Sequence, residues 1–175
     1  QVDCGKLSGL SMLGYGSLSG SYAGVWDTRG PSFHIDSKVE RLNIHQGNVK
    51  DMKVAMTYET GKLDVMATVE NEQMQGGVLL AYDLSDSLNF LSTRGQLRID
   101  ELAAFGLDIK GGQEALETSF EIIHAGQENK SFTNLSLTDF KYTCDTATFT
   151  IDKISMEDNQ KGDHNTTTLK SDVVD

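Results

Sequence analysis

The chain has few of the residues and patterns on which enzymes, metal sites and membrane spans are built. It contains two cysteines, one proline and four histidines in 175 residues, and the histidines lie far apart without the spacing of metal ligands. There is no Gly-x-Ser-x-Gly elbow, phosphate-binding loop, His-Glu-x-x-His or Cys-x-x-Cys motif. No apolar run approaches the ~20 residues that a spanning helix needs. We therefore expect a protein that is not an enzyme, uses no metal or cofactor and has no membrane-spanning segment in this sequence.

Positive charge is also scarce. Lysine and arginine number 15 against 26 acidic residues, which gives a net charge of −11. Nucleic acids and anionic lipid surfaces attract clustered positive charge, so both are disfavoured as partners. The acidic residues are spread along the chain, as on a solvated outer face. A hydrophobic content of 38% is sufficient for a core.

The two cysteines, Cys4 and Cys144, do not form a metal-type pair. Two interpretations stay open, a single disulfide or two buried thiols, and the second is favoured. The sequence begins without a leader pattern, and residues 168–175 resemble a strand cut off at its turn. We therefore expect a segment of a longer protein.

What the chain does have is a regular alternation of apolar and polar residues. Met52, Val54, Met56 and Tyr58 alternate with polar or small residues, a turn follows at 60–62, and the pattern resumes at Leu63. A period of two residues is that of a β-strand with one apolar face. The prediction is an all-β fold, a long antiparallel meander curled into a groove, with strands near 32–44, 48–59, 62–71, 74–84, 87–92, 95–102, 117–125, 131–142, 146–156 and 165–174.

Two regions interrupt this pattern. Residues 100–110 can form one short helix with Asp100 as its cap. The polar stretch 157–165 resembles a calcium loop in composition only, and a solvated hairpin tip is predicted there. The opening residues 1–31 are rich in glycine, so we divide the chain into this opening segment and a β-repeat region over 32–175.

The alternation predicts which side chains share a face. One face should carry the candidate ligand-contacting or core residues Met52, Val54, Met56, Leu63, Val65, Ala67, Val69, Val78, Leu80, Tyr82, Leu84, Leu97 and Ile99. The other face should carry Lys53, Asp64, Thr68, Glu70 and Arg98.

Residues 33–36 and 39–44, together with the Gly-x-apolar strand openings at Gly47, Gly61 and Gly95, resemble the AsmA-like proteins, in particular the TamB type. Residues 149–156 and the polar loop after them add to this resemblance. Those are long proteins of the Gram-negative envelope, anchored in the inner membrane. The resemblance implies a non-enzymatic periplasmic segment that shelters lipid acyl chains. It also implies support for outer-membrane lipid transport or protein assembly, through an outer-membrane barrel protein bound by the parent chain.

Other interpretations remain open. The apolar face can be an ordinary, self-filled core. A surface adhesin or passenger-type β-structure would instead bind a protein or glycan, and a lipocalin-like barrel would hold one small ligand. A groove predicts an exposed edge strand at 166–174, whereas a closed barrel has no edge.

Overall fold

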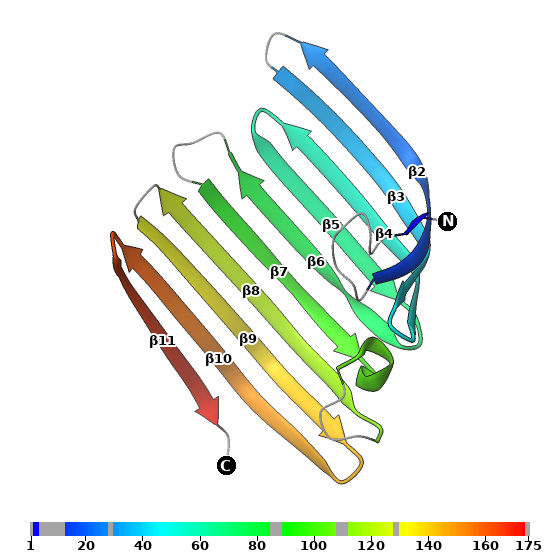
Figure 1. Ribbon diagram of the computed structural model, residues 1–175, viewed down its shortest axis with the longest axis vertical. Helices are drawn as coiled ribbons and strands as arrows, with labels where there is room; N and C mark the ends of the chain where they lie inside the picture. The colour runs from blue at the N-terminus through cyan, green and yellow to red at the C-terminus, as the bar shows by residue number, and fades with distance from the viewer. Residues whose placement is uncertain are drawn as a thin grey trace.

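The computed structural model describes residues 2–3, 13–27, 30–84, 89–107, 112–127 and 130–173. They form one antiparallel sheet of eleven strands, in which each strand lies beside its neighbours in the sequence (Figure 1). The strands are β1 (Val2–Asp3), β2 (Leu13–Asp27), β3 (Gly30–Ile44), β4 (Gly47–Glu59), β5 (Lys62–Glu70), β6 (Met74–Asp83), β7 (Asn89–Ile99), β8 (Ala115–Gln127), β9 (Lys130–Cys144), β10 (Ala147–Lys161) and β11 (His164–Val173).

The predicted all-β antiparallel meander is confirmed. The sheet does not close on itself, because β1 and β11 lie at opposite ends of the strand order. The closed lipocalin-like barrel is therefore wrong as a fold. As expected for an open sheet, β11 is an edge strand that pairs with β10 alone, and its side chains from His164 to Asp172 are exposed.

One predicted turn is wrong. Residues 93–95 were expected to separate two strands, but β7 runs without interruption from Asn89 to Ile99. Gly95 permits a close approach of two backbones, since a Cβ built there would lie 2.3 Å from the carbonyl oxygen of Gly77. Gly95 therefore allows two neighbouring strands to pack closely, and it does not form a turn.

Two further boundaries differ from the prediction. The short helix is a single 3₁₀ turn, Leu102–Phe105, that ends at Gly106 in a left-handed conformation with φ of 76°. The polar stretch 157–165 is mostly strand, because β10 continues to Lys161 and only residues 162–163 form the turn. Gly162, with φ of 59°, supplies the left-handed residue of this turn.

The glycine-rich opening segment contributes a full strand to the sheet. Most of β2 is paired with β3, and the hairpin register extends to Asp27 and Gly30, so the sheet continues across residue 31. Cys4 lies outside the described residues. Cys144 lies at the end of β9 and is 9% exposed.

The closed core of the described chain is small and lies at one end of the sheet. Residues 100–107 and 112–114, here called the cap, fold over one face at that end, as Figure 1 shows for the 3₁₀ turn. Leu102 and Phe105 of the cap are 2% and 5% exposed. They form a cluster with Val49, Ile99, Tyr142 and Cys144, which come from the three strands β4, β7 and β9.

Backbone and side-chain hydrogen bonds tie the cap to the strand turns beside it. The N–H of Gln46 donates to the carbonyl of Ala104 at 3.0 Å, and the N–H of Asp100 donates to that of Gln73 at 3.0 Å. The N–H of Gln113 donates to Asp145 Oδ1 at 3.0 Å. Three turns, between β3 and β4, β5 and β6, and β9 and β10, are thereby joined to one short segment.

The Phe105 ring should therefore be a principal source of stability. It lies where a Cβ on Gly47 would come within 2.6 Å of the ring, so it packs directly on the β4 backbone. We expect Phe105→Ala to lower the free energy of unfolding by about 3 kcal/mol, measured by urea denaturation. Leu107→Ala is the matched control, because Leu107 is 49% exposed in the same segment. Equal losses in both variants would contradict this role of the cap.

Candidate functional site

Strand register builds a continuous apolar face across the sheet. One cross-strand row runs from Tyr58 through Leu63 and Tyr82 to Leu91. The next row consists of Met56, Val65, Leu80 and Thr93, and the third of Val54, Ala67, Val78 and Gly95. We call this surface the apolar face and the opposite surface the polar face. From β3 to β7 the register places no charged side chain on the apolar face.

Most of the residues predicted from the sequence lie on this face and are half-buried. These are Met52, Val54, Met56, Leu63, Val65, Ala67, Val69, Val78, Leu80, Tyr82 and Leu97. Ile99 differs, because it is 3% exposed and belongs to the core cluster. Leu84 follows the end of β6 and is 48% exposed. The polar face carries Lys53, Asp64, Thr68, Glu70 and Arg98, all exposed.

The apolar face is wider than the predicted residue set. Cross-strand pairs extend it over β3 and over β8 to β10, through Phe33, Ile35, Phe120, Ile122, Leu135, Leu137, Ile154 and Met156. These strands show the same two-residue alternation in the sequence, and this pattern could have identified the additional residues. On β11, Leu169 continues the row of Met156 and is 70% exposed. Tyr22, opposite Ile35, is 88% exposed.

The cap forms a wall at one end of the apolar face. At its far end Glu114 is 2% exposed and accepts a hydrogen bond from the hydroxyl of Tyr142, with an oxygen–oxygen distance of 2.6 Å. The N–H of Leu102 donates to the carbonyl of Glu114 at 3.0 Å. These contacts hold the two ends of the cap together, so the apolar face is closed on the side where the cap lies.

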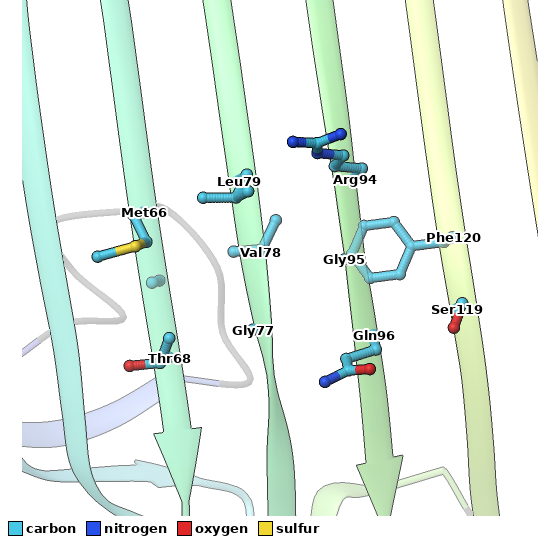
Figure 2. A pocket seen from close by; sticks show the side chains of 11 residues that line it. Met66, Thr68, Gly77, Val78, Leu79, Arg94, Gly95, Gln96, Ser119 and Phe120 are labelled. Atoms are coloured by element: carbon cyan, nitrogen blue, oxygen red, sulfur yellow. The ribbon is translucent and has the colours of Figure 1, made fainter.

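The polar face contains a shallow hollow of about 440 Å³ over β5 to β8. Figure 2 shows its lining residues, and Gly77 leaves room at the centre because it has no side chain. Met66 and Leu79 form an apolar border and are 48% and 43% exposed. Arg94 lies beside them, and its guanidinium extends from β7 toward β6 in Figure 2. Thr68, Gln96 and Ser119 add polar side chains to the border.

Ion pairs on the exposed surface shift three pKa values. Lys38 Nζ lies 2.5 Å from Asp51 Oδ1, and this hydrogen bond raises the pKa of Lys38 and lowers that of Asp51. Asp100 accepts a hydrogen bond from Arg98 at 2.9 Å, which raises the pKa of Arg98. All three shifted groups are solvent-exposed, so these pairs contribute little to stability.

The described residues offer no other chemistry that points to a catalytic or metal site. No group of three or more His, Cys, Asp or Glu among them is placed to hold a metal ion. Within the same part of the chain, no helix has the length and apolar character needed to cross a membrane. No protein-family model, curated protein or solved structure matches the chain. The resemblance to AsmA-like proteins therefore stays a prediction.

The pKa of Asp51 gives a direct check of the Lys38 pair. At neutral pH the carboxylate is ionised and paired, and the pairing is lost as the pH falls through its lowered pKa. In Lys38→Met we expect the pKa of Asp51 to rise toward its ordinary value of 3.8, followed by NMR titration of the carboxyl carbon. Lys62→Met, which removes the partner of Asp83, should leave Asp51 unchanged. An unaltered pKa in Lys38→Met would show that the pair does not persist in solution.

Proposed function

We propose that this protein is a non-enzymatic binder of lipid acyl chains, and that the apolar face is the surface that shelters them. The observation that carries the proposal is the breadth of this face. It extends over β3 to β10 in a single-layer sheet, and its side chains outside the core cluster are only partly buried. A self-filled core would bury these side chains, as it does for Leu102 and Phe105 under the cap.

The binding needs no specific polar contact. Each methylene removed from water contributes roughly 0.8 kcal/mol, so an acyl chain gains affinity in proportion to the length that is covered. The absence of charged side chains from this face between β3 and β7 favours an uncharged hydrocarbon there. Because neighbouring rows are chemically alike, a bound chain can move from one to the next.

The resemblance to AsmA-like proteins supports the wider role. In this proposal the parent protein is anchored in the inner membrane and this segment lies in the periplasm. Acyl chains held on the apolar face would pass toward the outer membrane. Alternatively, the parent chain would assist assembly of an outer-membrane barrel protein.

One observation favours a second candidate, a protein-binding surface of the adhesin type. The polar face exposes Met66, Leu79, Phe90 and Phe132, each at 36% or more. Binding of a protein partner would use this face, whereas binding of acyl chains would use the other. The two candidates therefore predict opposite effects for substitutions at adjacent positions of one strand.

Leu79 and Leu80 provide that comparison. They are neighbours on β6, and alternation places Leu80 on the apolar face and Leu79 on the polar face. The probe is the uncharged methyl ester of a fluorescent polyene fatty acid, titrated into the detergent-free protein. We expect Leu80→Ser to weaken binding about fivefold, because roughly one leucine side chain of apolar contact is lost, while Leu79→Ser leaves binding unchanged.

Circular dichroism and urea denaturation would establish that both variants remain folded. Failure of the unaltered protein to bind the probe would refute the proposal. A loss of affinity in Leu79→Ser alone would place the binding surface on the polar face. This result would also refute the proposal that acyl chains bind to the apolar face.

A further inference from the structure

The hollow on the polar face is bordered by four polar side chains. Around the hollow, Arg94, Gln96, Thr68 and Ser119 make no side-chain hydrogen bond or ion pair with any described residue. These four side chains bring several N–H and O–H donors to one small area.

Arg94 is the central group of this set. Its direct cross-strand neighbour on β8 is Glu121, yet no ion pair joins the two side chains. Figure 2 shows the guanidinium turned the other way, toward β6 and Leu79. A guanidinium has five N–H donors in a planar fork that matches a carboxylate. Arg94 therefore presents this fork beside the hollow.

The opposite border of the hollow is apolar. Met66 and Leu79 are directly paired across β5 and β6, and they remain about half-exposed on the polar face. Gly77, next to them, adds no side chain, and a Cβ there would find only ordinary contacts at 3.5 Å. An apolar group about the size of a short alkyl chain can rest on this border while its charged end reaches Arg94.

We infer that this hollow binds a small amphipathic carboxylate, a free acid with one carboxylate on a short apolar tail. Arg94 pairs with the carboxylate, Gln96 and the two hydroxyl groups donate further hydrogen bonds, and Met66 and Leu79 contact the tail. The charge arrangement selects this ligand class, because a cation with no ion-pair partner among the described residues lies next to exposed apolar side chains. This site lies on the opposite face from the proposed acyl-chain surface and does not depend on it.

Octanoate is a suitable probe, followed by NMR chemical shifts of backbone amides during a titration. For a ligand of this size we expect a dissociation constant on the order of a millimolar. The amides of Gly77 and Gly95 should shift, because both glycines line the hollow. Octanamide has a similar tail without the charge, and acetate has the charge without the tail, so both should bind at least about tenfold more weakly.

Two arginines on the same face of β7 give a matched pair of variants. Arg94→Gln should weaken octanoate binding about tenfold and abolish the preference for octanoate over octanamide. Arg98→Gln should change neither, because Arg98 already pairs with Asp100 at 2.9 Å. Glu121→Gln removes the negative charge directly across from Arg94, which would repel the carboxylate of the ligand, and should tighten octanoate binding about twofold.

The outcomes separate this inference from acyl-chain binding on the other face. Octanoate binding that survives Arg94→Gln but is lost in Leu80→Ser would overturn the inference and support the apolar face as the site. Equal binding of octanamide and octanoate to the unaltered protein, or equal losses in both arginine variants, would also overturn it. Urea denaturation of each variant shows whether the fold is kept, and we expect no change for Arg94→Gln, since this side chain forms no ion pair with any residue that the structure describes.

Discussion

The fold depends on the register of the hydrogen-bonded ladders between consecutive strands. Because side chains alternate along a strand, a shift of one residue in a single ladder would carry that strand's apolar side chains to the opposite face. The described sheet has no second layer, so the ladders align the faces with little help from a core. Of the large apolar side chains, those that the structure buries fully all lie in the cluster under the cap. The partial burial of the apolar face is a direct consequence of this single-layer arrangement.

Two aspartates allow both odd-numbered and even-numbered residues of one strand to contact the cap cluster. Asp51 and Asp139 have φ of 57° and 54°, in the left-handed region. Each interrupts the alternation of its strand, so Val49 and Met52 on β4 both contact the cap cluster although they are three residues apart. On β9, Phe140 packs against the cluster while Leu137 continues the apolar rows. At Asp139 the register with β8 also shifts between Glu117 and Ser119, as in a β-bulge, and such irregularities redirect side chains along a strand.

The sequence predicts much of this fold because the two-residue period is strong and local. It predicts the meander and the faces of the central strands, since Met52 to Tyr58 on β4 and Leu63 to Val69 on β5 have an apolar residue at every second position. The turn predicted at 93–95 is wrong because glycine is a common turn residue, whereas Gly95 lies within β7 and permits the close approach to Gly77 on the preceding strand, β6. That contact joins residues 18 positions apart and leaves no local signal.

The hollow on the polar face was not predicted for a related reason. Thr68, Gly77, Gln96 and Ser119 form one cross-strand row from four different strands, and only the combined register brings them together. The cap was predicted only as a short helix near 100–110. Its contacts with three distant turns depend on tertiary hydrogen bonds such as that of Gln73 with Glu101 at 3.0 Å. Neither feature has a sequence period that could reveal it.

A single-layer sheet with an open apolar face and open edges has to avoid self-association. Sheet edges template further strands, and β11 offers such an edge along its length. The net charge of −11 acts against this, because two copies approaching each other bring like charges together. Repulsion of this kind falls with distance over about 10 Å at moderate salt, so it opposes the approach of a second copy more than that of a small uncharged ligand. The acidic composition and the open apolar face are therefore compatible, since the charge keeps copies apart while the face remains accessible to hydrocarbon.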